Sequence, residues 1–281
     1  MRFSVRCRAR AGRSSTGFEK HESENVMKEF TKDKLTVKVM ATRTEMGRVA
    51  AQDIHDRILA LLKEKDEINM IFAAAPSQND VLKSLTEYTD IPWNRINACH
   101  MDEYIGLDKS APQGFGNFLM AHIFDLVPFK SVNLIDCSAT DPKAESERYT
   151  EILKKYPTDI VVMGIGENGH IAFNDPPVAD FNDPKWVKPV KLDEVCRQQQ
   201  VNDGCFAKFE DVPEYAMSLT CPTLMRATWK FCIVPAPTKA EAVLRTLTWD
   251  INEKCPATIL RRSDNAVLYL EPASAATLPQ A

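Results

Sequence analysis

Residues 160–177 read IVVMGIGENGHIAFNDPP, and this stretch decides the fold. Its first four residues are apolar at consecutive positions, which is the pattern of a strand buried on both faces of a parallel sheet. A short loop with three glycines and His170 follows directly. Because ligands collect at the carboxyl ends of strands in an open parallel sheet, this loop is the first place to look for a functional site.

Strand and helix patterns alternate along the rest of the chain. Short apolar or β-branched runs are followed by segments in which apolar residues recur at helical spacing. Such alternation requires crossover connections, so we predict a single α/β domain with a doubly wound, mostly parallel sheet and helices on both faces. Strands are expected at 35–41, 68–75, 96–101, 132–137, 159–164, 217–220, 229–236 and 266–270. Helices are expected around 46–62, 77–85, 115–124, 144–155 and 239–248. The least regular stretch, 176–213, is expected to form a long excursion or lid beside the site.

Length and composition restrict the class of protein. The chain has 281 residues, 44% of them hydrophobic, which is enough for a large core. Its formal net charge is −4, and acidic and basic residues are mixed along the chain, so it lacks the basic field of a nucleic-acid-binding protein. No apolar run reaches the roughly 20 residues of a membrane span. We therefore expect no nucleic-acid partner and no membrane insertion.

The distribution of the cysteines indicates the redox environment of the protein. They are scattered through a chain that is too long to need disulfide staples, so we expect free thiols in a reducing, cytoplasmic environment. The eight are Cys7, Cys99, Cys137, Cys196, Cys205, Cys221, Cys232 and Cys255.

The N-terminus has a different composition. Five arginines precede Glu19, the first acidic residue. Targeting peptides share this bias. We favour a disordered tail, or a chain start assigned upstream of Met27, over a targeting peptide. We assign 1–30 to a tail and 31–281 to the folded domain.

Two other strand ends carry polar residues. The segment 73–79 combines small residues with Ser77, Gln78 and Asn79 at a helix start, where free amides favour an anion, although an ordinary helix cap explains the pattern as well. Asp102 and Glu103 follow another strand. Since side chains alternate along an extended backbone, only one of these two acids is expected to face a pocket.

His170 is the leading catalytic candidate. Acids and amides surround it in the loop, and such neighbours fix the tautomer of an imidazole and tune its protonation. No second His, Cys or carboxylate stands at a familiar ligand spacing from it, so we expect no metal. The 164–166 sequence Gly-Ile-Gly departs from a dinucleotide fingerprint in the residues that follow, so no nucleotide cofactor is expected.

Two motifs together are specific enough to indicate a family. Residues 101–107, MDEYIGL, and 166–176, GENGHIAFNDP, resemble the glucosamine-6-phosphate deaminase/isomerase family, and the likeness runs from about residue 35 to 272. The resemblance implies a modified Rossmann-type fold. It also implies a hydrolase that converts a phosphorylated amino sugar, glucosamine 6-phosphate, to fructose 6-phosphate and ammonia without a cofactor. The resemblance leaves open whether the protein forms a homo-oligomer.

The resemblance also implies residue roles. His170 would move a proton at the ring oxygen during ring opening, and Asp102 would carry a proton between C2 and C1. Asp175 matches a carboxylate that supports the histidine. Lys239 matches a phosphate-binding lysine, and residues 238–241 read as a capping box at a helix start. Ser77 would complete the phosphate cradle.

Several positions depart from the family pattern. Asn168 replaces an aspartate beside the histidine, and an amide orients an imidazole without neutralising its charge. Glu167 is a candidate to compensate. The usual Thr-Gly-Gly-Thr type of loop is replaced from Ser77 onward, and Arg197 is the candidate for a phosphate-binding arginine.

These departures leave alternatives. A galactosamine-6-phosphate isomerase would keep the same proton transfers. A 6-phosphogluconolactonase shares the Gly-x-Gly-x-Asp-Gly-His type of loop, but this chain continues it as Ala-Phe-Asn-Asp-Pro instead of the Ser-Leu-Phe-Pro type. A sugar-phosphate sensor without turnover is the third alternative; Asn168 favours it, and retention of Asp102, His170 and Asp175 opposes it.

Overall fold

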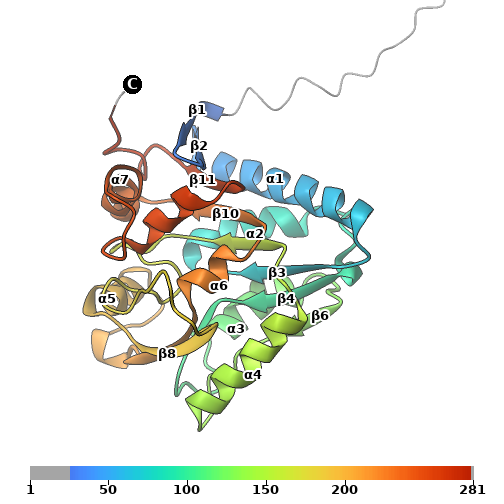
Figure 1. The fold of residues 1–281 in the computed structure, drawn as a ribbon, viewed down its shortest axis with the longest axis vertical. Helices are drawn as coiled ribbons and strands as arrows, with labels where there is room; N and C mark the ends of the chain where they lie inside the picture. The colour runs from blue at the N-terminus through green and yellow to red at the C-terminus, as the bar shows by residue number, and fades with distance from the viewer. Residues whose placement is uncertain (1–25, 280–281) are drawn as a thin grey trace, which may run out of the picture.

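The computed structural model describes residues 26–279, and a sheet of eight strands forms its centre (Figure 1). The strand order is β1-β2-β11-β10-β7-β3-β4-β6, and every neighbouring pair from β2 to β6 is parallel. This confirms the predicted doubly wound, mostly parallel α/β sheet. The strands are β1 Val26–Lys32, β2 Leu35–Met40, β3 Ile68–Phe72, β4 Ile96–His100, β6 Ser131–Asn133, β7 Ile160–Met163, β10 Trp229–Val234 and β11 Ala266–Leu270.

Helices cover both faces of this sheet. The α-helices are α1 Arg43–Glu64, α2 Asn79–Thr86, α3 Phe115–Leu119, α4 Pro142–Lys155, α5 Glu194–Asn202, α6 Cys221–Met225 and α7 Ala240–Thr248. A π-helical turn, Met120–Phe124, extends α3, so the predicted helix 115–124 is present. Short 3-10 turns lie at Pro76–Gln78, Trp93–Arg95, Phe209–Asp211, Pro237–Lys239 and Pro256–Arg262.

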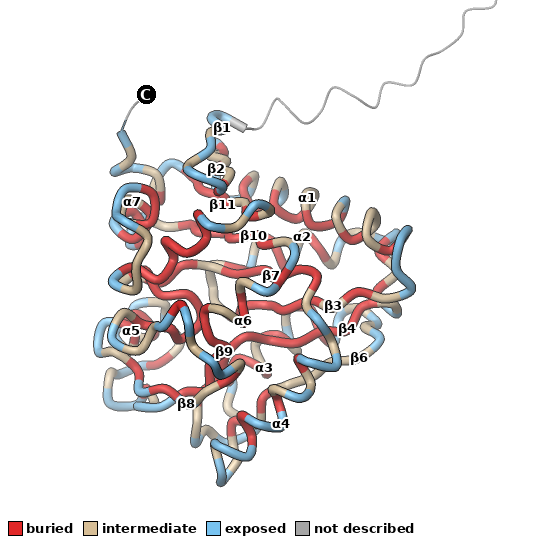
Figure 2. The backbone as a smooth tube through the Cα atoms, viewed as in Figure 1, coloured by how far each residue is buried: buried red, intermediate tan, exposed pale blue. Residues whose placement is uncertain are grey.

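Alternate residues of the central strands enter two separate cores. Met70 and Phe72 of β3 pack with residues of α1, α2 and α3. Ile71 of β3, between them, packs on the other side with Tyr149 of α4 and Val243 of α7. Period-two alternation between two apolar faces explains why the strand sequences are apolar at every position. Figure 2 shows these strands as the buried centre of the molecule.

A second, three-stranded antiparallel sheet corrects the predicted strand arrangement. It has the order β5-β9-β8, with β5 Asp102–Tyr104, β8 Val187–Lys191 and β9 Tyr215–Leu219. The predicted strand 217–220 therefore belongs to this small sheet and not to the parallel one. Likewise, 176–213 is more regular than predicted, because it contains β8 and α5.

The domain begins earlier than predicted. β1 pairs with β2 in antiparallel fashion, so residues 26–30 belong to the sheet and not to the tail assigned to 1–30. The rest of that tail, residues 1–25, lies outside the described residues. The seven cysteines within residues 26–279 are free thiols. Within the same range, no helix combines the length and apolar character needed to cross a bilayer.

Two predicted helix caps are wrong. Ser77 lies inside the 3-10 turn before α2, and neither this turn nor α2 has a side-chain cap. The capping box expected at 238–241 is absent as well, because α7 has no side-chain cap and Glu241 pairs with Arg245 instead. Both helices follow a proline-initiated 3-10 turn, and that turn replaces the cap.

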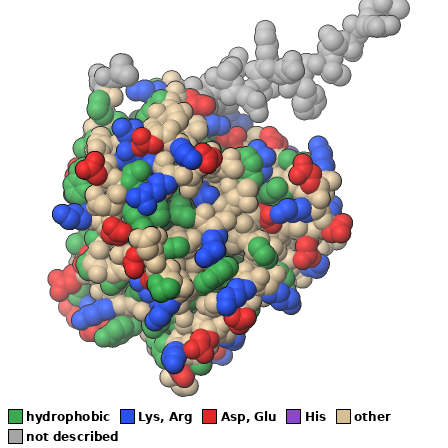
Figure 3. Space-filling model, viewed as in Figure 1, with side chains coloured by type: hydrophobic (Ala, Val, Ile, Leu, Met, Phe, Trp, Pro, Cys, Tyr) green, Lys and Arg blue, Asp and Glu red, His purple; other side chains and the backbone are tan. Residues whose placement is uncertain are grey.

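Charged side chains of both signs are interspersed on the surface. On the face in Figure 3, Lys and Arg lie among Asp and Glu over the whole view. This agrees with the mixed charge pattern of the sequence.

Tyr149 provides a test of how α4 is fixed to the sheet. Its buried hydroxyl accepts from the backbone N–H of His100 at 2.9 Å and lies 2.9 Å from the His100 carbonyl, to which it donates. Tyr149→Phe leaves both groups of β4 unpartnered, so we expect the free energy of unfolding to fall by about 1–3 kcal/mol. Urea titration measures this. Tyr156→Phe is the matched control, and an equal loss in both variants would contradict the role given to the Tyr149 hydroxyl.

Candidate active site

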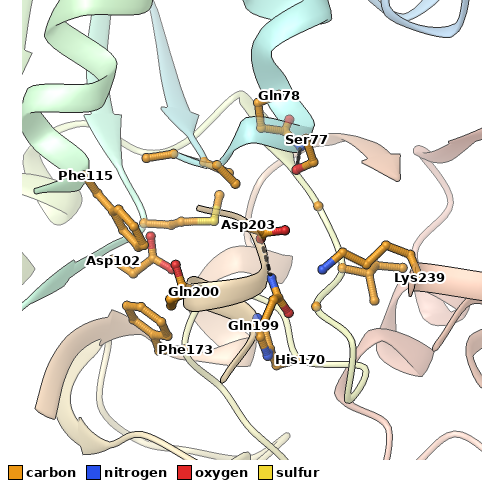
Figure 4. A pocket seen from close by; sticks show the side chains of 18 residues that line it. Ser77, Gln78, Asp102, Phe115, His170, Phe173, Gln199, Gln200, Asp203 and Lys239 are labelled. Carbon is orange, nitrogen blue, oxygen red and sulfur yellow. Dashed lines mark hydrogen bonds between the residues drawn. The ribbon is translucent and has the colours of Figure 1, made fainter. Parts of the chain in front are cut away.

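The carboxyl ends of four parallel strands and one helix of the small-sheet region line a single pocket (Figure 4). Asp102 approaches from one side, His170 from the base and Lys239 from the opposite side. Ser77 and Gln78 lie at the end near Lys239. The pocket is lined by Ala73, Ala74, Ala75, Ser77, Gln78, Met101, Asp102, Phe115, Gly164, Ile165, Gly166, His170, Ala172, Phe173, Gln199, Gln200, Asp203 and Lys239.

Glycines allow the loop after β7 to hold His170. A Cβ at Gly166 would lie 2.1–2.4 Å from ring atoms of His170, so any side chain there would displace the imidazole. Gly169 has φ +89°, a left-handed conformation that glycine adopts without strain. Ala172 also has a positive φ of 47°. The backbone of this loop is therefore shaped around the histidine ring.

Hydrogen bonds fix the orientation of the His170 ring. Its Nδ1 lies 2.9 Å from Oδ1 of Asn168 and 2.9 Å from Oδ1 of Asp175. Two acceptors at this distance require a proton on Nδ1. The other ring nitrogen, Nε2, is left for a ligand in the pocket.

Asp175 is a buried carboxylate that stays ionised. Burial raises its pKa, but the charge of His170 and hydrogen bonds from His170, Asn168 and the Asp193 backbone outweigh burial and lower the pKa below the usual value. An ionised Asp175 stabilises a proton on the imidazole. The supporting position predicted for Asp175 thus agrees with its contacts.

Asn168 joins the histidine to two carboxylates. Its Oδ1 accepts from the backbone and the ring of His170, and its Nδ2 donates to Asp175 and to Asp193, both at 3.0 Å. Asp193 was not predicted as a site residue, and it brings a second carboxylate to the network. Glu167, the predicted compensating residue, makes no hydrogen bond to His170; its backbone N–H donates to Gln199.

Asp102 and Glu103 point in different directions, as the alternation of side chains predicts. Glu103 accepts from the backbone N–H groups of Tyr104, Phe115 and Gly116, which attaches β5 to the start of α3. Asp102 lines the pocket. Burial, and then the neighbouring charge of Glu103, raise the pKa of Asp102 well above its usual value.

Lys239 carries the positive charge at the other end of the pocket. It is the last residue of the 3-10 turn Pro237–Lys239 after β10, and Ala236, just before this turn, has φ +83° and donates its N–H to Glu271. Lys239 is 4% exposed, and its Nζ has no hydrogen-bond partner within residues 26–279. Burial lowers the pKa of Lys239, and the charges of Asp203 and Glu167 oppose this shift. An unpaired buried ammonium beside Ser77 is suited to an anion.

Two predicted binding residues do not line the pocket. Asn79 begins α2 and is not among the lining residues. Arg197, the predicted phosphate-binding arginine, instead donates to the carbonyls of Phe209 and Val212 and stacks on the Phe209 ring. The guanidinium of Arg197 fastens the segment after α5.

Three other residues of the α5 region do line the pocket. Gln199, Gln200 and Asp203 were not predicted from the sequence. The resemblance pointed only to Arg197 in this segment, and the helical register of the segment was not known. Gln199 and Asp203 are four residues apart, so a helix places them on the same face.

His170, Asp175 and Cys196 form a buried cluster of possible metal ligands. One ligand atom of each lies within 4.8 Å of the others. Asp175 follows His170 by 5 positions and Cys196 follows Asp175 by 21, and neither spacing is a familiar metal-ligand spacing. Since Nδ1 of His170 and the Asp175 carboxylate already bind each other and Asn168, the cluster is a hydrogen-bonded pair beside a thiol.

Comparison with known proteins identifies the family. The family model for glucosamine-6-phosphate isomerases and 6-phosphogluconolactonase matches residues 41–269. This chain belongs to that family. The match includes β3, β4, β7 and β10, whose carboxyl ends form the pocket.

Two relatives of this chain carry the name of one of the two activities in the family description. The chain is 30% identical over 237 residues to a glucosamine-6-phosphate deaminase of Bacillus cereus (strain G9842), covering 84% of this chain and 87% of that protein. It is 32% identical over 194 residues to a protein of the same name from Streptococcus suis (strain 05ZYH33), covering 69% and 81%.

Solved structures of the family share the fold. A monomeric glucosamine-6-phosphate deaminase superposes with a TM-score of 0.77 at 25% identity, covering 85% of this chain and 98% of that one. A 6-phosphogluconolactonase from Thermotoga maritima gives 0.69 at 19% identity, covering 85% and 100%, which supports the fold alone.

Asn168→Asp tests the network around His170. The change removes both N–H donors and places a third carboxylate against Asp175 and Asp193, so we expect the free energy of unfolding to fall by about 1–3 kcal/mol at pH 7.5. The repulsion raises the folded-state pKa of the cluster, so the loss should shrink as the pH falls to 5. Urea titrations at both pH values measure it, with exposed Asn94→Asp as the control. A loss that does not depend on pH would contradict this account.

Proposed function

We propose that this chain converts glucosamine 6-phosphate, or a close amino-sugar phosphate, to the ketose 6-phosphate and ammonia. One observation carries the proposal: the Asp102 carboxyl and the His170 imidazole, from separate strand ends, line one pocket together with Lys239. A proton-transfer pair at one end and a cation at the other suit a small phosphorylated sugar. The names of the relatives at 30–32% identity agree with this substrate.

Ring opening is assigned to His170. Because Nδ1 is held by Asn168 and Asp175, Nε2 is the nitrogen that exchanges a proton with the sugar. The C1 hydroxyl loses a proton and the ring oxygen gains one as the C1–O5 bond breaks, so the net charge of the sugar does not change. The ionised Asp175 stabilises the imidazolium that forms between these two transfers.

Isomerisation is assigned to Asp102. Its carboxylate takes the proton from C2 of the open-chain amino sugar and returns it to C1. The aldehyde oxygen at C1 gains a proton and the amino nitrogen loses one, which leaves a hydroxymethyl group at C1 and an imine at C2. Water adds to the imine and ammonia leaves, so the overall reaction consumes one water and is a hydrolysis. The raised pKa of Asp102 makes it a stronger base than an ordinary aspartate.

Phosphate binding is assigned to Lys239, Ser77 and Gln78. Lys239 provides a buried charge that has no other partner within the described residues. Ser77 lies in the turn that opens α2 and lines the pocket beside Lys239 (Figure 4). A cytoplasmic location and a possible homo-oligomer stay predictions of the sequence.

Product analysis tests the reaction. Purified protein incubated with glucosamine 6-phosphate, galactosamine 6-phosphate and 6-phosphogluconolactone is assayed for ammonia, ketose phosphate and acid. We expect ammonia and ketose phosphate in equal amounts from one amino sugar. Acid release from the lactone alone would replace the proposal with a lactonase, and binding of an amino-sugar phosphate without any product would replace it with a sensor.

Substitutions at the two proton-transfer residues test their roles. His170→Ala should lower kcat by at least about 10²-fold, because it removes the imidazole assigned to the ring oxygen. Asp102→Asn should lower kcat similarly, while calorimetry still detects binding of glucosamine 6-phosphate. Undiminished turnover in either variant would remove that residue from the mechanism.

Asp102→Asn should also stabilise the fold at alkaline pH. The folded-state pKa of Asp102 is raised, so its ionisation costs stability as the pH rises above the unfolded value. An amide does not ionise, and the variant should therefore gain free energy of unfolding relative to wild type at pH 8 and lose this advantage toward pH 4. Urea titrations across this range measure the difference. A variant that is less stable than wild type at pH 8 would show that Asp102 is not held in an unfavourable environment.

A further inference from the structure

A carboxylate opposes the charge of Lys239 at the phosphate end of the pocket. Lys239 is its cation, and Asp203 lines the same pocket on the side that faces Lys239 (Figure 4). The charge of Asp203 acts on Lys239 more strongly than that of any other residue, and Glu167 adds to it. A site built only to attract a phosphate dianion would not place a carboxylate here, since like charges repel strongly away from bulk water.

Asp203 is held in this position by hydrogen bonds. Its Oδ2 accepts from Nε2 of Gln199 at 3.2 Å, and its backbone N–H donates to the Gln199 carbonyl at 2.8 Å. Gln199 is in turn fixed, because its Oε1 accepts from the backbone N–H of Glu167 at 2.8 Å. The carboxylate is therefore part of the pocket wall and not a freely moving surface group.

The pocket end also offers a second hydrogen-bond acceptor. Nε2 of Gln78 donates to Oγ of Ser77 and to the carbonyl of Ile233, which leaves Oε1 as the free end of the amide. Oε1 is buried and has no partner within residues 26–279. A phosphate dianion has only acceptors to offer to Gln78 and Asp203, whereas a phosphate monoanion carries one O–H donor.

We propose that Asp203 is a specificity-determining residue that selects the monoanionic form of the phosphate and weakens binding of the dianion. The proposal rests on the assignment of this pocket end to phosphate. Lys239 donates to the phosphate oxygens, and the P–O–H group donates to Asp203 or Gln78. A phosphate ester has its second pKa at about 6, so both forms are available around neutral pH.

Calorimetric titration with inorganic phosphate tests this. Asp203→Asn keeps the shape of the side chain and removes its charge, so we expect it to bind phosphate at least about tenfold more tightly than wild type at pH 7.5. The gain should be smaller at pH 5.5, where the monoanion predominates. In turnover assays the same variant should show a lower KM for glucosamine 6-phosphate with kcat changed less than about twofold.

The charged and titratable groups around this end are Lys239, Asp203, Glu167, Cys196 and His170. Histidines in general gain charge between pH 7.5 and 5.5, so the pH dependence of wild type alone is not the test. The test is the difference in phosphate affinity between Asp203→Asn and wild type at each pH. Asp211→Asn, an exposed aspartate outside this pocket, controls for the change in net charge. Equal or weaker phosphate binding by Asp203→Asn at pH 7.5 would overturn the proposal.

Lys239→Met separates this proposal from the function on which it rests. If Lys239→Met binds phosphate as wild type does, the assignment of the phosphate end is wrong, and the role of Asp203 fails with it. If Lys239→Met loses phosphate binding and Asp203→Asn does not gain it, only the role of Asp203 is wrong. Removal of a buried, unpaired ammonium should not unfold the chain, and near-UV circular dichroism checks that both variants are folded.

Discussion

The site depends on one buried arrangement, in which Nδ1 of His170 is held between Asn168 and Asp175. A buried carboxylate is costly unless it is paired and hydrogen-bonded. Asp175 meets that condition with the imidazole, the Asn168 amide and the Asp193 backbone, which together lower its pKa despite burial. The ring fits only because residue 166 has no side chain. Because β7 lies between β10 and β3 in the sheet, the loop after it is next to the loops that carry Lys239 and Ser77.

Two buried carboxylates of this pocket region have their pKa values moved in opposite directions. Asp175 is surrounded by donors and a histidine, and its pKa is lowered; Asp102 is buried beside Glu103, and its pKa is raised. Groups of one type with divergent environments are a common sign of separate acid and base roles. Glu103 is central to this difference, because its three backbone hydrogen bonds hold β5 in place and its charge acts on Asp102. The pair of adjacent acids therefore divides into one carboxyl that holds β5 in place and one that faces the pocket.

The sequence predicted the parallel sheet and three of the strand ends that line the pocket, because buried strands are apolar at every position and the loops after them are polar. It did not predict the small sheet. β8 contains Lys188, Pro189 and Lys191 among its five residues, and such a strand has no strong apolar pattern. Arg197 was misplaced for a related reason: whether residue 197 or residue 199 faces the pocket depends on the rotation of α5, which tertiary contacts determine. The predicted caps of α2 and α7 are absent because proline-initiated 3-10 turns precede both helices.

The contacts of Asn168 change what its departure from the family pattern means. Taken from the sequence, an amide beside the catalytic candidate suggests a lost negative charge and so favours a sensor. In the structure, the amide donates to Asp193, a carboxylate that begins α5 and was not recognised as part of the site. The Asp193 carboxylate is thus connected to the His170 ring through the Asn168 amide, which also donates to Asp175. Asn168 accepts from the histidine with its oxygen and donates to the two acids with its nitrogen, so the network retains an oriented imidazole and nearby carboxylates. The substitution at 168 therefore gives no physical reason to exclude turnover.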